Sequence, residues 1–218
     1  MSYESFQKAL TLDWLHKHGY PHELKHACAA FDGDVEAANM LACTLENHKR
    51  GAVAVAMWRT KVPVPAYRVY LSAAWEHDHR YVIDAAQTRR TLGYMFRYAA
   101  FPLPAEIPDV LTVWRGTSSL PIDVARTGHS WTTDRDMACW FAMRFADHNG
   151  SPLVLAADVA KSDIALFTND RSESEAVLMR SPAARIDGDV SDWSACCQRK
   201  QDAKDRDRKA MLNSASNE

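Results

Sequence analysis

Apolar residues recur at helical spacing in the first part of the chain. One predicted helix carries apolar side chains three or four positions apart, at Leu24, Ala27, Cys28 and Phe31. An earlier apolar segment begins near Leu10 and is interrupted by Gly19-Tyr20-Pro21. Asp32-Gly33-Asp34 predicts a turn, and Asp34 is the expected N-cap of a helix over Val35 to Leu45. Residues 66–101 predict two further helices, the second over Tyr81 to Ala100.

The pattern changes where prolines interrupt helix formation, at Pro102, Pro104 and Pro108. Three β-rich runs then predict strands at Val110 to Trp114, Leu153 to Leu155 and Glu175 to Met179. Between the first two, residues 134–146 predict a helix with one apolar face, formed by Ala138, Phe141, Ala142 and Phe145. The expected fold class is therefore α+β, with a mostly helical N-terminal region before a β core.

The first three predicted helices occupy about 40 residues. The segments His18-Gly19-Tyr20 and Phe31 to Ala38 resemble the turns of a ubiquitin-associated-type helical bundle. A helical hairpin packed on the main domain explains the same pattern, and the two interpretations stay open.

Composition adds constraints on partners. The chain has 218 residues, of which 47% are apolar and 25% charged, as in an ordinary globular protein. The net charge of −2 gives no overall attraction to nucleic acid or to a membrane, so any basic patch must be local. The tail from Ser191 mixes aspartates with basic residues and predicts a solvated helix or a frayed end. Its basic residues are Arg199, Lys200, Lys204, Arg206, Arg208 and Lys209.

The sequence also indicates a compartment. Its longest uncharged apolar stretch, Gly51 to Trp58, is far too short to cross a bilayer, so no membrane partner is expected. The first residues have no basic region followed by an apolar core, so we expect no signal peptide. Five cysteines, an odd number without a Cys-x-x-Cys pair, favour a reduced cytoplasmic protein over a disulfide framework or a structural zinc site.

Three segments carry the candidate chemistry, and their order is informative. A predicted strand ends in Trp114-Arg115-Gly116-Thr117. Gly128-His129-Ser130-Trp131-Thr132-Thr133 then leads into a helix that contains Ala138-Cys139-Trp140-Phe141-Ala142. Finally, Arg171-Ser172-Glu173-Ser174-Glu175 runs into a predicted strand.

This order resembles the arginine–serine–glutamate clade of mono-ADP-ribosyltransferases. That family has a strand-end arginine followed by glycine, a serine-threonine-serine strand with an alanine-x-x-phenylalanine helix behind it, and a glutamate-x-glutamate loop. The resemblance covers about residues 108–180. It implies an ADP-ribosyltransferase-like split β core. It also implies three segments, namely a helical module over 1–48, a transferase domain over 49–190 with its own N-terminal helices, and a charged tail over 191–218.

One position departs from the family pattern. Serine-threonine-serine appears here as Ser130-Trp131-Thr132, so the two outer hydroxyls remain and the central threonine is a tryptophan. Ser130 stays a candidate active-site hydroxyl. Trp131 and Thr132 are candidates for the border of the NAD pocket, as is Gly116 beside Arg115.

The resemblance implies a role for each catalytic candidate. NAD is the expected substrate, and no metal is expected. Breaking its nicotinamide–ribose bond develops positive charge on the ribose, which the carboxylate of Glu175 would stabilise. Arg115 offers a planar fork for the pyrophosphate or its flanking ribose. Ser130 would orient Glu175, and Glu173 would face the acceptor and take its proton or align a guanidinium.

Each residue alone has a structural explanation. Arg115-Gly116 after a strand is a common turn, Ser130 could cap the following helix, and Glu173 and Glu175 could alternate on an exposed strand. The shared order, with steps of 15 residues from Arg115 to Ser130 and 45 from Ser130 to Glu175, favours the functional interpretation. His77-Asp78-His79 has metal-ligand residue types but the wrong period for one helix face. The sequence also lacks the glycine-rich loops of Rossmann and P-loop proteins.

The acceptor stays open in part. In the family, glutamate at the position of Glu173 usually accompanies a protein arginine, which is therefore the expected acceptor. A nucleic acid base is the alternative, with phosphate contacts from the basic tail and the Arg80 to Arg97 helix. A non-catalytic NAD- or partner-binding module is the alternative outside the enzymes. As a toxin or effector, such a transferase would need an antitoxin or an export route, and the helical module could have a partner of its own.

Overall fold

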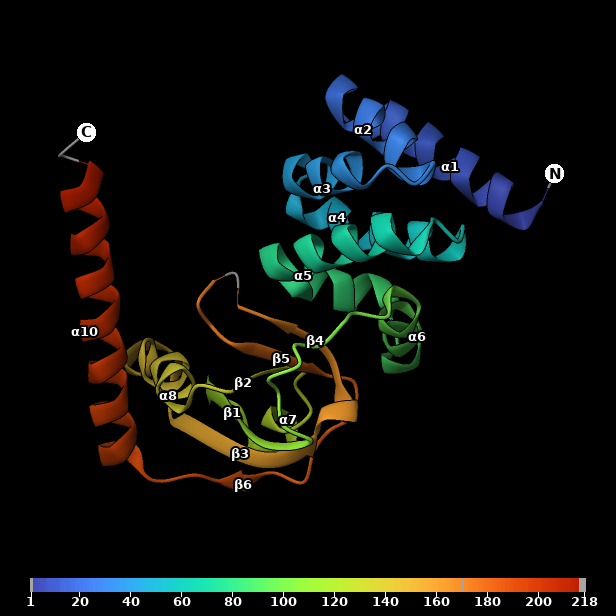
Figure 1. Cartoon of the computed structure of the whole chain (residues 1–218). Helices are drawn as coiled ribbons and strands as arrows, with labels where there is room; N and C mark the ends of the chain where they lie inside the picture. The colour runs from blue at the N-terminus through green and yellow to red at the C-terminus, as the bar shows by residue number, and fades with distance from the viewer. Residues whose placement is uncertain (1, 170, 216–218) are drawn as a thin grey trace. The chain divides into compact units, whose positions relative to one another are not determined.

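The computed structural model describes residues 2–169 and 171–215. The chain divides into two compact units between Phe101 and Pro102 (Figure 1). The predicted segments 1–48, 49–190 and 191–218 do not correspond one to one with these units, and they stay a prediction about domain organisation. The α+β class, with a helical N-terminal region and an antiparallel sheet, is confirmed.

Unit 1 consists of helices. Residues 2–101 form α1 (Tyr3–His18), α2 (Pro21–Phe31), α3 (Val35–Thr44), α4 (Asn47–Arg59), α5 (Val64–Ala86) and α6 (Arg89–Ala99). The side chain of Asp34 accepts a hydrogen bond of 2.8 Å from the backbone N–H of Ala37, which confirms Asp34 as the N-cap of α3.

The last two helices of unit 1 differ from the sequence prediction. The predicted helix over Tyr81 to Ala100 is interrupted, because Gln87 has a left-handed φ of 61° and ends α5. Thr88 then caps α6 through a hydrogen bond of 3.1 Å from the N–H of Thr91 to its hydroxyl. Asp78, which the sequence places between two histidines, is a non-helical residue at a kink inside α5.

Unit 2 is built on an antiparallel sheet. Its strands are β1 (Val110–Ser118), β2 (Ser130–Thr132), β3 (Pro152–Ala160), β4 (Ile164–Thr168), β5 (Glu175–Leu178) and β6 (Arg185–Ile186). Within the described part of unit 2 these strands lie in the order β4-β5-β2-β1-β3-β6. The helices of the unit are α7 (Ile122–Ala125), α8 (Arg135–Met143), α9 (Ala146–Asn149) and α10 (Val190–Ala215), and Lys161–Asp163 form a 3₁₀ turn.

The sheet opens between β1 and β2. Among the described residues, Trp114 opposite Thr132 is the one pair that joins these two strands, whereas β1 and β3 pair over nine positions. Continued pairing would place Gly116 opposite Ser130, but the strands diverge before that point. The sheet therefore consists of two three-stranded parts, β4-β5-β2 and β1-β3-β6, joined at a single position.

Both faces of the sheet are covered. One face buries Val113, Trp131, Ala176 and Leu178 together with Ala125 of α7. On the other face, α8 and α10 pack together over Val154, with Trp193 and two cysteines between them (Figure 1). The predicted apolar face of α8 is corrected in part. Met137, Ala138, Cys139 and Ala142 are buried, whereas Phe145 lies beyond the end of the helix and is 50% exposed.

No helix in residues 2–169 and 171–215 has the length and apolar character that crossing a membrane requires.

Candidate functional site

Arg115 lies where the sheet opens. Its Nη1 donates a hydrogen bond to the backbone carbonyl of Ser130, across the gap that pairing between β1 and β2 would otherwise close. A Cβ atom added to Gly128 would lie 2.1 Å from Cζ of Arg115, so the guanidinium packs directly on this glycine. Nε of Arg115 is buried and has no hydrogen-bond partner within the described residues.

The electrostatics of Arg115 link it to Glu175. Burial lowers the pKa of the Arg115 guanidinium, and the carboxylate of Glu175 partly raises it. A half-buried cation with a buried, unused donor, within electrostatic reach of a buried carboxylate, is costly for stability alone. Such an arrangement is typical of binding and catalytic sites.

Strand register brings the serine and glutamate segments together. β2 and β5 pair antiparallel with Ser130 opposite Val177 and Thr132 opposite Glu175. Because alternate residues of a strand share a face, Ser130, Thr132 and Glu175 project to one face of the sheet. Thr132, rather than Ser130, is directly opposite Glu175, and Ser130 is its diagonal neighbour.

Trp131 lies on the opposite face. Its ring is 2% exposed in the core of the sheet, and its Nε1 donates a hydrogen bond of 2.9 Å to the carbonyl of Gly128. Trp131 thereby fixes the backbone of the glycine on which Arg115 rests. Gly116 has a packing role as well, because a Cβ there would lie 1.6 Å from the carbonyl oxygen of Ala138 in α8.

The loop before β5 is hydrogen-bonded to the end of β2 and to the residue that follows it. The hydroxyl of Thr132 donates a hydrogen bond of 2.6 Å to the carbonyl of Glu173, and the N–H of Thr133 bonds the carbonyl of Ser174 at 3.0 Å. Ser172 and Ser174 have φ values of 55° and 47°, in the left-handed region that non-glycine residues rarely adopt. Residues 171–174 therefore form a strained loop and not an extended strand.

Both glutamates face one guanidinium. Nη2 of Arg171 lies 2.8 Å from Oε2 of Glu173 and 3.8 Å from Oε2 of Glu175. The side chain of Glu175 is only 4% exposed, that of Glu173 is 19% exposed, and that of Arg171 is 44% exposed. The two carboxylates thus form an acidic site in which Glu175 is buried inside the protein and Glu173 is partly exposed at its edge.

Two further cations, Arg144 and Lys204, lie against aromatic rings and within electrostatic reach of Glu173. The guanidinium of Arg144 lies 4.5 Å from the ring centre of Trp140 and 4.6 Å from that of Phe141, and Lys204 Nζ lies 3.4 Å from the Trp140 ring. Burial lowers the pKa of both Arg144 and Lys204, and the carboxylate of Glu173 opposes this shift in each. The outer glutamate is therefore reached by cations from α8 and α10.

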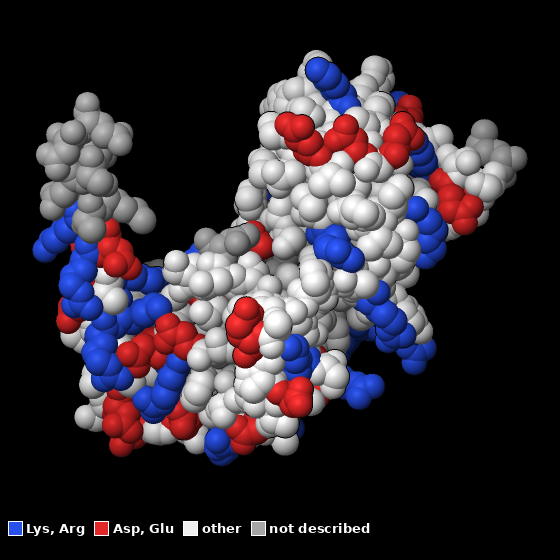
Figure 2. Space-filling model, viewed as in Figure 1, with Lys and Arg blue, Asp and Glu red and all other residues white. Residues whose placement is uncertain are grey.

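Most of the charged tail lies in α10, and two of its cations pair with aspartates at the start of α8. Arg199 contacts Asp136 at 2.7 Å and Lys200 contacts Asp134 at 2.5 Å. On the face that Figure 2 shows, positive and negative side chains lie side by side along the coloured part of this helix. Pairing of this kind reduces the positive potential that a phosphate backbone would meet.

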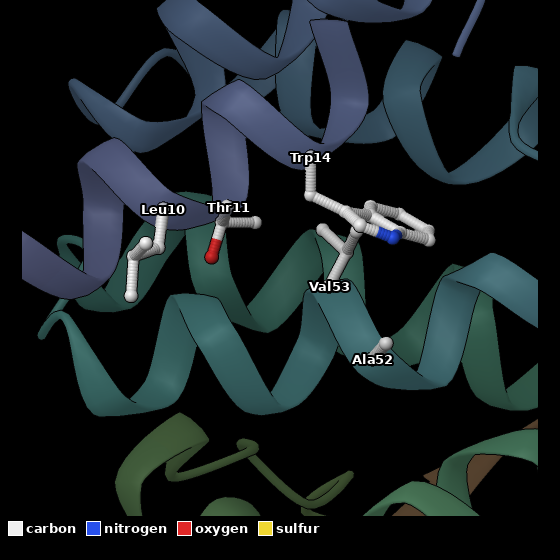
Figure 3. Close-up of a pocket in the computed structure, with 5 residues that line it drawn as sticks. All are labelled: Leu10, Thr11, Trp14, Ala52 and Val53. Carbon is white, nitrogen blue, oxygen red and sulfur yellow. The ribbon is translucent and has the colours of Figure 1, made fainter. Parts of the chain in front are cut away.

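Unit 1 contains two open pockets whose lining residues differ in type from those around Arg115 and Glu175. One, of about 280 Å³, lies between α1 and α4 and is lined by Leu10, Thr11, Trp14, Ala52 and Val53 (Figure 3). The second, of about 510 Å³, is lined by Trp14, Lys17, His18, Gly19, Tyr20, Glu46, His48 and Lys49. Within the described ranges, no group of three or more histidine, cysteine or acidic side chains could hold a metal ion.

The sequence reasoning missed two residues of this site. The sequence alone does not indicate a role for Gly128. The structure shows that glycine is required there, because the Arg115 guanidinium lies against its backbone. Arg171 stands two residues before Glu173 and four before Glu175, a spacing visible in the sequence. Its contact with both carboxylates depends on the turn at Ser172, which the sequence does not reveal.

The comparisons with known proteins give no family for this chain. No family model matches it, no curated protein matches its sequence, and no solved structure matches its fold.

Proposed function

We propose that the chain is a mono-ADP-ribosyltransferase that transfers ADP-ribose from NAD to an arginine of a protein and releases nicotinamide. In this proposal unit 2 has an ADP-ribosyltransferase-like fold, and the opening between β1 and β2 receives NAD. The sequence order of Arg115, Ser130 and Glu175 in three separate segments motivates it.

One observation carries the proposal. Half-buried Arg115 and buried Glu175 are 60 residues apart in the sequence, yet the carboxylate of Glu175 partly offsets the lowering of the Arg115 pKa by burial, and Arg115 donates a hydrogen bond to the backbone carbonyl of Ser130. Glu175 is opposite Thr132 of β2, and Thr132 is opposite Trp114 of β1, the residue before Arg115, so the two segments lie in one row across the sheet where it opens.

The chemistry suits these groups. The guanidinium of Arg115 has an unused Nε–H donor and would bind a phosphate or ribose oxygen of NAD. As the bond between C1′ and nicotinamide breaks, positive charge develops on the ribose. The carboxylate of Glu175 is shielded from water, so its stabilisation of that charge is stronger than it would be in solvent. The hydroxyl of Ser130 shares the face of Glu175 and would position the nicotinamide side of NAD.

The acceptor follows from Glu173. Its carboxylate already binds a guanidinium, that of Arg171, at 2.8 Å, which is the chemistry that recognition of an acceptor arginine needs. The alternative acceptor, nucleic acid, is less favoured because Arg199 and Lys200 of α10 are paired with aspartates of the chain itself.

A labelling experiment tests the acceptor. The protein is incubated with NAD labelled in its adenylate part and with cell lysate, and the products are treated with protease or with nuclease. We expect label that protease releases and nuclease does not. Label sensitive only to nuclease would replace arginine by a nucleic acid base, and absence of transfer together with absence of nicotinamide release would refute the enzyme itself.

Glu173→Gln separates the two glutamates. We expect this variant to lose transfer to protein but to keep slow hydrolysis of NAD, because Glu175 still stabilises the ribosyl cation and water can intercept it. Glu106→Gln, at an exposed position of the same unit, is the matched control. Equal loss of transfer and hydrolysis in Glu173→Gln would instead place Glu173 in the NAD site.

A further inference from the structure

We propose that Arg171 is itself an acceptor, so that the chain attaches ADP-ribose to its own acceptor loop. This inference rests on the proposed function and adds a modification site to it. The observation behind it is that the guanidinium of Arg171 occupies the position that an acceptor arginine would take.

The contacts define that position. Arg171 Nη2 lies between the two carboxylates, 2.8 Å from Glu173 and 3.8 Å from Glu175. Glu173 is the group assigned to the acceptor, and Glu175 is the group beside the reacting carbon of NAD. A guanidinium within 4 Å of both is therefore next to the point where the new bond forms.

The backbone keeps Arg171 there. The loop is fixed by hydrogen bonds from β2 at Glu173 and Ser174, and Ser172 in the left-handed region turns the chain so that Arg171 points back to the glutamates. An acceptor tethered in this way needs no encounter with another molecule, and its effective concentration exceeds that of any free target.

A purely structural ion pair explains less. The pair between Arg171 and Glu173 is partly exposed and therefore screened by water, so it stabilises the fold too little to offset two left-handed serines flanking Glu173. The guanidinium also approaches Glu175, whose side chain is almost fully buried. If Glu175 only stabilised the fold, it would not need a contact with an exposed arginine.

The reaction balances with these groups alone. The bond between C1′ of the ribose and the nicotinamide nitrogen breaks, and its electron pair leaves with nicotinamide, which becomes neutral. A guanidinium nitrogen of Arg171 gives a proton to Glu173 and forms the new bond to C1′. The glycosylated guanidinium keeps its positive charge, and Glu173 later releases the proton to water.

Mass spectrometry of the full chain tests the proposal. After incubation of the wild-type protein with NAD alone, we expect a mass increase of one ADP-ribose, which peptide mapping locates at Arg171. Arg171→Lys keeps a positive charge beside Glu173 but removes the guanidinium, so the adduct should be lost. Arg180→Lys, at an exposed arginine after β5, is the matched control and should leave the adduct in place.

Two further measurements distinguish the outcomes. Agmatine, a small guanidine, is offered as a free acceptor, and Arg171→Ala should modify it faster than the wild type does because this variant leaves no cation at the acceptor position. Wild-type chain mixed with inactive Glu175→Gln chain should leave the inactive chain unlabelled if the reaction is intramolecular. Modification of agmatine without any adduct on Arg171 would overturn this inference and leave the enzyme standing, whereas no nicotinamide release under any condition would overturn both.

Discussion

Buried charged groups occur in both units, and their surroundings differ. In unit 1, Arg50 donates Nε to the carbonyl of Ala42 at 2.6 Å and Nη2 to that of Cys43 at 3.3 Å, so it ties the end of α3 to α4. Lys49 bonds the carbonyl of His18 at 2.9 Å, at the end of α1. In unit 2, Arg115 has one such bond, to Ser130, and a buried Nε without a partner among the described residues.

The difference indicates what each charge does. A buried cation whose donors reach backbone carbonyls at a helix end satisfies groups that the helix leaves open, and its role is structural. A half-buried cation with a buried, unused donor, within electrostatic reach of a buried carboxylate, has no such role, and this combination is typical of ligand-binding sites. Glu23 shows the limit of the criterion, because its Oε1 lacks a partner in the described chain although Oε2 bonds the N–H of Tyr20 at 2.8 Å.

The largest expected effect is on chemistry in unit 2. Glu175→Gln keeps the shape of the side chain but removes its charge, so the developing ribosyl cation loses about 3–4 kcal/mol of stabilisation, a fall of roughly 10²–10³ in turnover. Nicotinamide release measures the loss, and circular dichroism should show an unchanged fold. Turnover close to that of the wild type would remove Glu175 from the mechanism.

The next effect is on stability in unit 1. Arg50→Ala leaves carbonyls of α3 without their donors and should lower the free energy of unfolding by about 3 kcal/mol. Urea unfolding followed by far-ultraviolet circular dichroism measures it, with Arg59→Ala at an exposed position of α4 as the control. If Arg50→Ala and Arg59→Ala unfold alike, the bonds of Arg50 do not stabilise the bundle, and the structural side of the comparison fails.

Gly128→Ala tests whether Arg115 binds a ligand or only stabilises the fold. The added methyl group would overlap the Arg115 guanidinium, which can move because it is the flexible end of a side chain. We expect nearly unchanged stability and NAD binding weaker by about 1.5–3 kcal/mol, the cost of one lost hydrogen bond to a charged group. Calorimetric titration with NAD measures the affinity. Unchanged affinity with lowered stability would make Arg115 a structural residue like Arg50.

The smallest effect concerns charges at the surface. Arg199 pairs with Asp136 through two hydrogen bonds, yet its side chain is 59% exposed. We expect Arg199→Ala to lower stability less than Arg50→Ala does, because water screens exposed pairs. The same urea experiment measures it. A loss as large as that of Arg50→Ala would show that the contact between α8 and α10 depends on this pair and not on the apolar residues beneath it.

The sequence alone determined the local features of this protein. The N-cap at Asp34, the strands that begin at Val110 and Glu175, and the change from helices to strands after Phe101 follow from side chains acting on backbone a few residues away. The order of Arg115, Ser130 and Glu175 is likewise a property of the chain, although a prediction of function from it stays a prediction.

Only the tertiary structure decided what these residues touch. Register placed Thr132 rather than Ser130 opposite Glu175, the opening of the sheet set Arg115 against Gly128, and left-handed serines turned Arg171 onto the two glutamates. These contacts join segments up to 43 positions apart or depend on rare backbone angles. Neither hydrophobic period nor residue type encodes them, because strand pairing and loop conformation are settled by packing over the whole sheet.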